Sequence, residues 1–399
     1  MNTNVCFYPA NILLPKEGFE KWAVIACDQF TSNKEYWNSV ESKVGDAPST
    51  LRLTLPEIYL SDNNDPKING INSAMESYLE NGVFEEHPGS MIYVERTQHD
   101  GKIRKGIIGA IDLEDYDYHK GAKTLIRATE ETVPDRLPPR IRIRRNASLE
   151  LPHVMMLIDD PENTVIGVLT GKKEDFKKLY DFELMMGGGS IKGYELDENT
   201  VCGVQNALAS LASGDDPLLF AVGDGNHSLA AAKECYLRDP GPENRYALVE
   251  VVNIHDDALV FEPIYRVIFG VSKDTLMREL ENFYGDLDTP NGKKITVICA
   301  GERFDIFPAP LSGLPVGTVQ AFVNHLCSKY GNITVDYVHE LDTVTELSAK
   351  EKTVGFIFDG MKKDELFSTV ISDGALPRKT FSMGEGCDKR YYIEARKIK

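Results

Sequence analysis

Residues 217–239, PLLFAVGDGNHSLAAAKECYLRD, constrain the fold more than any other stretch of the chain. Residues 218–222 form an unbroken apolar run between turn residues, which predicts a short strand buried on both faces. The glycines at 223 and 225 predict a turn in which the backbone can adopt positive φ and be approached closely. The apolar spacing after the turn predicts a helix that buries Leu229, Ala232, Tyr236 and Leu237. The stretch is therefore expected to fold as strand, glycine turn and helix.

Three side chains in this turn can carry chemistry, namely Asp224, Asn226 and His227. The free N–H groups at the start of a helix bind anions, and a carboxylate beside an imidazole suits acid–base work or phosphate handling. The structural alternative is that Asp224 and Asn226 only cap the helix and that His227 is a surface residue. The concentration of polar groups at the end of a buried strand, where open α/β sheets bind ligands, favours a functional site.

Composition restricts the class of protein. A chain of 399 residues with 42% hydrophobic content is expected to form two or three structural units. Its 44 basic and 62 acidic residues give a net charge of −18, which repels nucleic acid and anionic membranes. The seven cysteines include no C-x-x-C pair, so we expect reduced thiols rather than disulfides or a zinc site. Without a leader-like or membrane-spanning run, we expect a cytoplasmic protein with a small-molecule substrate and no nucleic-acid or membrane partner.

The remaining patterns predict an α/β protein with mixed sheets. Alternating residues around Asp100-Gly101 predict a hairpin over 90–113. We expect strands at 151–158, 164–169 and 247–254, and helices at 200–212 and 272–283. The run MMGGGS at 185–190 lacks the Gly-Lys-Ser/Thr ending of a phosphate loop and is expected to be a hairpin tip. Three parts follow: an N-terminal α/β region (1–115), a core with the glycine turn (116–260) and a smaller C-terminal α+β region (261–399).

Residues 116–150 form a basic segment in an otherwise acidic chain. Three prolines interrupt its arginines, which are Arg127, Arg136, Arg140, Arg142, Arg144 and Arg145. Such a run is usually a solvated, salt-bridged surface. The alternative is that the prolines hold a rigid, non-helical path and aim the arginines at phosphate, which the planar guanidinium binds with two hydrogen bonds at once.

The chain also resembles a known family, the bacterial "domain of unknown function 1015", and through it the ParB/sulfiredoxin superfamily. The resemblance rests on the turn GDGNHSLAAA and on four further segments, FYPANILLP, YVERTQHDGKIRKGIIG, ATEETVPDRL and LPRKTFSM. It implies a ParB/sulfiredoxin-like core that binds a nucleotide at the glycine turn. The superfamily includes DNA-partition CTPases, sulfiredoxins and free-serine kinases.

Residue differences at the turn separate these branches. Sulfiredoxins carry a cysteine before the histidine, whereas this chain has Asn226, which excludes thiol chemistry at that position. The kinases carry an acidic residue and a histidine, which this chain keeps as Asp224 and His227. The signature arginine that follows is replaced here by Ser228. The resemblance therefore points to the kinase branch and leaves the phosphate contact at Ser228 in need of a substitute.

The resemblance also implies residues outside the turn. Glu130 and Thr132 match a His-Glu-x-Thr pattern whose histidine position is Thr129 in this chain, and Glu130 corresponds to a catalytic base. Arg136 matches a second family position. Arg378 and Lys379 lie in a basic Pro-Arg-Lys-Thr segment that is either a surface turn or a phosphate-binding loop.

Together these features favour a phosphotransferase that uses ATP, ADP or pyrophosphate and acts on a small metabolite, with free serine as the best single acceptor. Glu130 is expected to accept the proton of the acceptor hydroxyl, Asp224 to hold Mg²⁺ or orient the nucleophile, and His227 to act beside them. The expected phosphate-binding residues are Gly223, Gly225, Asn226 and Ser228 at the turn, with Arg136, Arg378 and Lys379. A phosphomonoesterase that uses the same site and a non-catalytic nucleotide-binding regulatory protein are the alternatives. A metal-dependent hydrolase is weaker, because no two histidines have the spacing of a zinc site.

Overall fold

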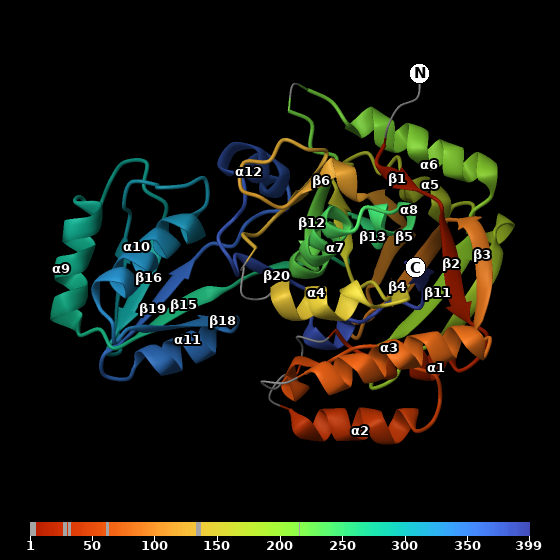
Figure 1. Cartoon of the computed structure of the whole chain (residues 1–399). Helices are drawn as coiled ribbons and strands as arrows, with labels where there is room; N and C mark the ends of the chain where they lie inside the picture. The colour runs from red at the N-terminus through yellow and green to blue at the C-terminus, as the bar shows by residue number, and fades with distance from the viewer. Residues whose placement is uncertain (1–4, 27–29, 31–32, 61–63, 133–136, 215) are drawn as a thin grey trace. The chain divides into compact units, whose positions relative to one another are not determined.

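The computed structural model describes the chain except for residues 1–4, 27–29, 31–32, 61–63, 133–136 and 215 (Figure 1). The described residues form two compact units. Unit 1 comprises the residues up to Leu259 together with Gly384–Lys399, and unit 2 comprises Val260–Met383. Within the described ranges, no helix is both long and apolar enough to cross a membrane.

Unit 1 is built on a ten-stranded mixed sheet with the strand order β10-β11-β4-β5-β13-β9-β12-β7-β6, and β1 pairs with β5 beside this path. In chain order the strands are β1 (Phe7–Tyr8), β4 (Ile92–Thr97), β5 (Ile103–Asp112), β6 (Tyr116–Asp117), β7 (Ile126–Ala128), β9 (Met155–Ile158), β10 (Lys177–Glu183), β11 (Ser190–Glu195), β12 (Phe220–Asp224) and β13 (Tyr246–Asn253). The predicted α/β class with mixed sheets is confirmed, and the apolar run that predicted a buried strand is β12, near the middle of the sheet.

Alternating side chains of this sheet fill a separate core on each face, as the two-residue period of strands requires. Ile107 and Val249 pack in one core with α6 (Glu198–Leu211) and α7 (Asn226–Arg238). Their neighbours Ile108 and Leu248 pack in the other with α3 (Asp65–Glu80). Unit 1 also contains α1 (Phe19–Trp22), α2 (Lys34–Val44), α4 (Leu137–Arg145), α5 (Gly167–Thr170), α8 (Pro242–Arg245) and the strand pairs β2 (Ala10–Pro15) with β3 (Phe84–Ser90) and β8 (Leu149–Glu150) with β21 (Arg396–Lys397).

The last residues of the chain belong to unit 1, whereas the sequence analysis placed them with the C-terminal region. Ile393 and Ala395 are fully buried in the core shared with α3. The backbone N–H of Ala395 donates to the carbonyl of Leu13 over 2.9 Å, and Arg396 pairs with Glu150 at 2.7 Å. Residues 384–399 are therefore held in unit 1 by burial and ion pairing.

Several local predictions match the structure and two do not. The hairpin around Asp100-Gly101 is β4–β5, the glycine run is the tip of the β10–β11 hairpin, and the helix at 200–212 is α6. The predicted strand at 164–169 is wrong, because Gly167–Thr170 is the short helix α5, with Val165 and Ile166 buried beside it. The prediction that α7 buries Leu237 is also wrong, since this residue is 57% exposed.

The basic segment forms a helix, α4, rather than the non-helical path predicted from its prolines. Pro138 and Pro139 lie in the first turn of α4 within the described residues. The backbone N–H that proline lacks would have no intrahelical acceptor there. α4 packs against α7 through Ile141, Ala231 and Cys235, and the two helices lie side by side in Figure 1.

Unit 2 is a smaller α+β assembly. Its antiparallel five-stranded sheet has the order β17-β16-β19-β15-β18. The strands are β15 (Tyr265–Phe269), β16 (Ile295–Cys299), β17 (Glu302–Ile306), β18 (Thr334–Val338) and β19 (Thr353–Phe358), with the pair β14 (Phe261–Pro263) and β20 (Phe381–Met383) beside them. The helices are α9 (Lys273–Tyr284), α10 (Pro315–Lys329), α11 (Leu341–Ser348) and α12 (Glu365–Asp373). The predicted helix at 272–283 is α9, and the Ser272 side chain caps it by accepting from the N–H of Thr275.

Candidate functional site

The glycine turn joins β12 to α7 in the predicted manner. β12 includes Gly223 and ends at Asp224, Gly225 adopts φ 83°, and α7 begins at Asn226. The N–H of Gly225 donates to Oδ1 of Asp224 over 2.8 Å. A Cβ on residue 225 would lie 3.1 Å from the Cα of Val154 in the chain entering β9, so both the backbone angle and the close approach require glycine.

Asn226 ties the turn to the end of β7. Its Oδ1 accepts the backbone N–H of Thr129 over 3.2 Å, and its amide lies 3.4 Å from Oγ1 of Thr129. The Thr129 hydroxyl donates to the carbonyl of Val222 over 2.6 Å. Asn226 is only 7% exposed, and Thr129 is fully buried. The Asn226 side chain therefore holds the turn to β7, and the predicted phosphate contact of Asn226 stays a prediction.

This connection brings two carboxylates to one edge of the sheet. β7 and β12 are parallel, with Ala128 opposite Val222. Glu130 and Asp224 each follow two residues later, beyond the last paired residues, at the carboxyl ends of the two strands. Both residues are partly exposed. The role predicted for Glu130 beside the turn stays a prediction.

A basic residue that the sequence analysis missed also reaches the turn. Nζ of Lys389 lies 3.7 Å from Oδ2 of Asp224, and their side chains are 22% and 35% exposed. Lys389 follows a short helical turn at Gly386–Asp388, and its carbonyl accepts the N–H of Ala26 over 2.7 Å. Lys389 gives the turn the positive charge that the replacement of arginine by Ser228 removes.

A cavity of about 170 Å³ opens beside the first turn of α7. Its polar lining includes Ser228 and His153, whose Oγ and Nε2 lie 3.3 Å apart. The other lining residues come mainly from α4, the 147–154 segment and the 53–60 segment, and they are largely apolar. His227 is half-buried in the same first turn of α7. The turn therefore adjoins a space of the size of one small ligand.

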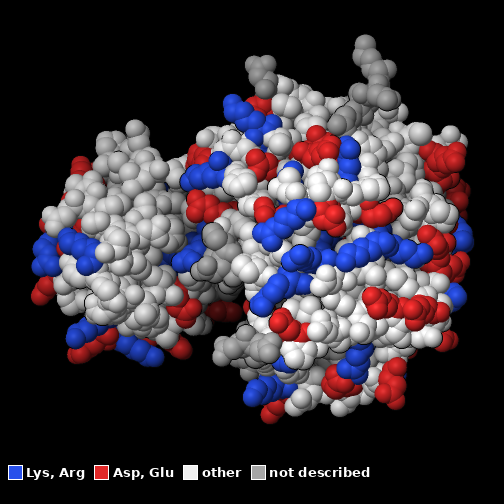
Figure 2. All heavy atoms as spheres, in the orientation of Figure 1, with Lys and Arg blue, Asp and Glu red and all other residues white. Residues whose placement is uncertain are grey.

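Three of the four arginines of α4 are engaged in ion pairs, as the simpler interpretation of the basic segment predicted. Arg140 pairs with Glu57 at 3.1 Å, Arg142 with Asp65 at 3.7 Å and Arg144 with Glu150 at 2.7 Å. Basic side chains gather on the face of unit 1 that carries α4 (Figure 2). Arg140 and Arg144 still line the cavity.

The other predicted phosphate ligands are not brought to the turn by the described structure. Arg136 lies outside the described residues. Arg378 and Lys379 belong to unit 2, where Nε of Arg378 donates to the hydroxyl of Tyr337 over 3.0 Å and the carbonyl of Lys379 accepts from Arg266 over 2.9 Å. Their approach to Asp224 therefore stays a prediction.

A buried layer of charges lies on the α3 side of the sheet, next to the turn. Nε and Nη2 of Arg104 donate to the two carboxylate oxygens of Glu250 over 3.3 and 2.6 Å. The Tyr392 hydroxyl donates to the carbonyl of Val154 over 2.9 Å. Burial first, and then the charge of Glu250, raise the pKa of Tyr392, and Asp224 adds to the effect. The charge of Asp224 in the turn therefore acts on Tyr392 in this buried layer.

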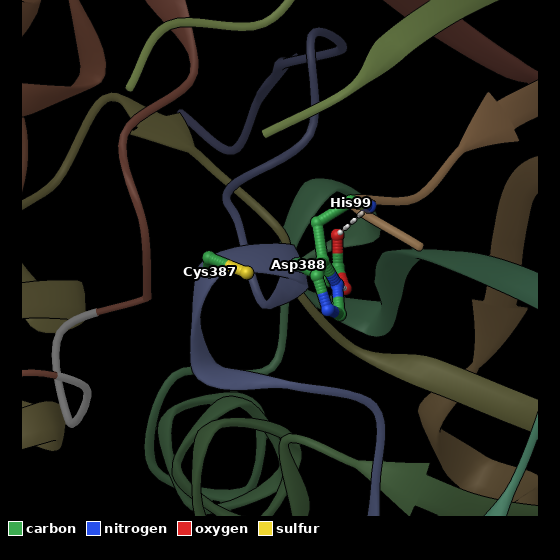
Figure 3. A group of neighbouring side chains, drawn as sticks. All are labelled: His99, Cys387 and Asp388. Carbon is green, nitrogen blue, oxygen red and sulfur yellow. Dashed lines mark hydrogen bonds and ion pairs between the residues drawn. The ribbon is translucent and has the colours of Figure 1, made fainter. Parts of the chain in front are cut away.

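One group within the described part of the chain has metal-ligand chemistry, namely His99, Cys387 and Asp388 (Figure 3). Their ligand atoms lie within 4.8 Å of one another. Nδ1 of His99 is already 2.7 Å from Asp388, whose other oxygen accepts the N–H of His99. The nearby guanidinium groups of Arg96 and Arg390 also oppose a further cation here. We therefore interpret this group as a hydrogen-bonded anchor between the β4–β5 turn and the C-terminal segment.

Solved structures similar to this chain include a mutant free serine kinase in complex with ADP, which is 14% identical with a TM-score of 0.42 over 71% of this chain and 89% of that chain. A conserved hypothetical protein from Pyrococcus furiosus is 13% identical with a TM-score of 0.38, over 69% of this chain and 90% of its own. SbnI from Staphylococcus aureus, with a C-terminal truncation, is 12% identical with a TM-score of 0.38, over 69% and 82%. No curated protein matches in sequence. The family described as "Protein of unknown function (DUF1015)" matches residues 8–368, and the chain belongs to this family, as its sequence motifs predicted.

Proposed function

We propose that this protein is a phosphotransferase that uses a nucleotide or pyrophosphate to phosphorylate a hydroxyl group of a small metabolite. The observation that supports the proposal is the parallel register of β7 and β12, because Glu130 and Asp224 follow these two strands at the same edge of the sheet. Phosphoryl transfer needs a positioned nucleophile, a phosphate site and positive charge more than it needs covalent chemistry. In this proposal Glu130, the start of α7 and Lys389 supply them.

The phosphate is held by the start of α7 in this proposal. The N–H groups of Asn226, His227 and Ser228 lie in the first turn, where they have no intrahelical acceptor and the helix dipole favours an anion. The αL conformation of Gly225 directs the chain into this turn and keeps a side chain away from the phosphate. Lys389 supplies the positive charge that Ser228 cannot.

The donor set fits Mg²⁺. Oδ2 of Asp224 lies 3.7 Å from Nζ of Lys389, and Mg²⁺ in phosphoryl-transfer sites commonly uses one or two carboxylates with substrate phosphates and water. Asp224 is the residue that would hold the ion, which would neutralise charge on the transferred phosphoryl group. Because Lys389 and a metal ion compete for the same carboxylate, Asp224 exchanges one positive partner for another when the metal binds.

Glu130 is the base in this proposal, and it accepts the proton of the attacking hydroxyl. The adjacent cavity holds the acceptor or part of the donor, with Ser228 and His153 as its polar contacts. Free serine is the acceptor to assay first, because the GDGNH turn resembles the free-serine-kinase branch.

The test is a product assay with serine, Mg²⁺ and either ATP, ADP or pyrophosphate, followed by mass spectrometry. We expect phosphoserine, and we expect Glu130→Gln and Asp224→Asn each to lower kcat by about 10²–10⁴-fold. Asp239→Asn, an exposed carboxylate at the other end of α7, is the matched control and should leave kcat unchanged.

Each other result points to a different conclusion. Release of inorganic phosphate without phosphoserine would favour the phosphomonoesterase alternative with water as acceptor. Saturable nucleotide binding without any product would favour a regulatory binding protein. Unchanged kcat in both carboxylate variants would show that Glu130 and Asp224 do not form the catalytic site.

A further inference from the structure

Arg96 on β4 is a buried guanidinium that makes no hydrogen bond to a carboxylate among the described residues. It is 3% exposed, and neither Nε nor Nη2 has a hydrogen-bond partner. These two atoms form one edge of the guanidinium, the edge that grips a carboxylate or phosphate with two parallel bonds. Arg104, directly opposite on β5, uses the same edge to hold both oxygens of Glu250. The two arginines thus have the same chemistry and burial, but only Arg104 has an anion.

The surroundings of Arg96 carry excess positive charge. Arg390 is 2% exposed, donates through Nε to Cys387 O and through Nη1 to Ala23 O, and also interacts with the Tyr36 hydroxyl. Burial, and then the charges of Arg104 and Arg390, lower the pKa of Arg96 to about 9, so it stays charged at neutral pH. Glu250 is taken by Arg104, and Asp388 is already bonded to His99.

The glycine-rich tip of the β10–β11 hairpin closes over this region. A Cβ on Gly188 would lie 2.4 Å from Nε of Arg390, and one on Gly189 would lie 1.9 Å from the carbonyl of Thr97. The tip therefore packs directly on Arg390 and on the residue after Arg96. These close approaches explain the glycines that the sequence analysis assigned to a hairpin tip rather than to a phosphate loop.

A buried unpaired charge is strongly destabilising, so a protein keeps one where a ligand completes it. We propose that Arg96 and Arg390 form an oxyanion site that takes a phosphate group, with Lys389 as the link between this site and Asp224. The site requires a doubly accepting oxyanion, because the two parallel donors of Arg96 have no acceptor. The inference rests on the proposed function only in naming phosphate as the oxyanion.

The test compares the full chain with Arg96→Met and Arg104→Met by thermal unfolding and calorimetric titration with pyrophosphate and inorganic phosphate, against sodium chloride of equal ionic strength. Without ligand, Arg96→Met should raise Tm, because it removes an unpaired buried charge. Arg104→Met should lower Tm, because it leaves Glu250 unpaired. Pyrophosphate should stabilise the wild type, and Arg96→Met should bind it about 10- to 100-fold more weakly, as expected for losing hydrogen bonds to a charged group.

Two results would overturn the site. One is a fall in Tm for Arg96→Met with unchanged pyrophosphate affinity, which would make Arg96 structural. The other is the absence of any stabilisation of the wild type by either anion. If Arg96→Met does not fold, Arg96→Lys keeps the charge without the two-pronged edge, and it should fold and bind weakly.

The outcome is separable from that of the product assay. Anion binding that depends on Arg96 without turnover would leave this site standing and remove the phosphotransferase. Turnover that depends on Glu130 and Asp224, with normal anion binding by Arg96→Met, would support the phosphotransferase and remove the oxyanion site.

Discussion

The Oδ1 atom of Asn226 accepts the backbone N–H of Thr129 over 3.2 Å, and this bond joins the first residue of α7 to the end of β7. Thr129 immediately precedes Glu130, and Asn226 follows Asp224 by two residues. One buried amide therefore links the two chain segments that carry the carboxylates on which the proposed chemistry depends.

Asn226→Ala should destabilise unit 1. It leaves the buried N–H of Thr129 without its acceptor, which costs about 1–3 kcal/mol. Urea unfolding measures the change, and Asn206→Ala on the exposed face of α6 is the control, with an expected effect within about 0.5 kcal/mol. Equal effects of the two substitutions would show that the bond contributes nothing.

Two glycine-to-alanine substitutions should change the free energy of unfolding in opposite directions. Gly225→Ala forces φ 83° on an L-residue and brings Cβ to 3.0 Å from the Val154 side chain, so we expect a loss of about 1–3 kcal/mol. Gly203→Ala lies inside α6 with nothing within 4 Å of the new Cβ, and it should stabilise by about 0.5–1 kcal/mol. Thermal unfolding of both variants checks the pair. A gain in stability from Gly225→Ala would contradict the strained conformation of the turn.

The parts of this molecule that could be predicted from sequence are those whose cause is local. Asp100-Gly101 specifies its hairpin turn, Ser272 caps α9, and Gly225 carries the positive φ that separates β12 from α7. Each depends on residues within a few positions of one another. The strand prediction at 164–169 is wrong because a short apolar run is compatible with a strand or with a buried helical turn. Its packing in the folded protein determines that the run forms α5.

The parts that could not be predicted depend on contacts between distant segments. Nothing near Lys389 in the sequence indicates that it reaches Asp224, because the C-terminal residues return to unit 1 only through burial of Ile393 and Ala395. The same return creates the layer in which Arg96 lacks an anion. The carboxylate pairing was predictable only in outline, since it needed the parallel register of β7 and β12.

Lys389→Met should strengthen metal binding while removing a phosphate contact. A positive charge 3.7 Å from Oδ2 of Asp224 opposes a cation on that carboxylate by about 1 kcal/mol in a largely solvated setting. We therefore expect the apparent Kd for Mg²⁺, measured by calorimetry without nucleotide, to fall by about threefold to tenfold. Lys178→Met, an exposed lysine on β10 that pairs with Asp181, is the control and should not change it. A weaker Mg²⁺ affinity in Lys389→Met would show that Asp224 is not the metal ligand.

Glu394 should make stability fall as pH rises. It is fully buried with Oε2 unpartnered, and burial raises its pKa to about 7, while the Tyr180 hydroxyl donates to Oε1. The folded state therefore holds a proton that the unfolded state has released above its pKa of about 4.3, so stability is lost between about pH 4.5 and pH 7, by up to about 3 kcal/mol. Urea unfolding across this range measures the slope.

Glu394→Gln isolates this contribution from those of the other titrating groups. The amide carbonyl still accepts from Tyr180, and no charge appears as pH rises. The variant should match the wild type near about pH 4.5 and exceed its stability by up to about 3 kcal/mol near about pH 8. Glu346→Gln, an exposed glutamate on α11, should follow the wild type throughout. A constant offset between Glu394→Gln and wild type at every pH would mean that Glu394 keeps an ordinary pKa in the folded protein, and that the buried layer around Glu250 tolerates a further negative charge.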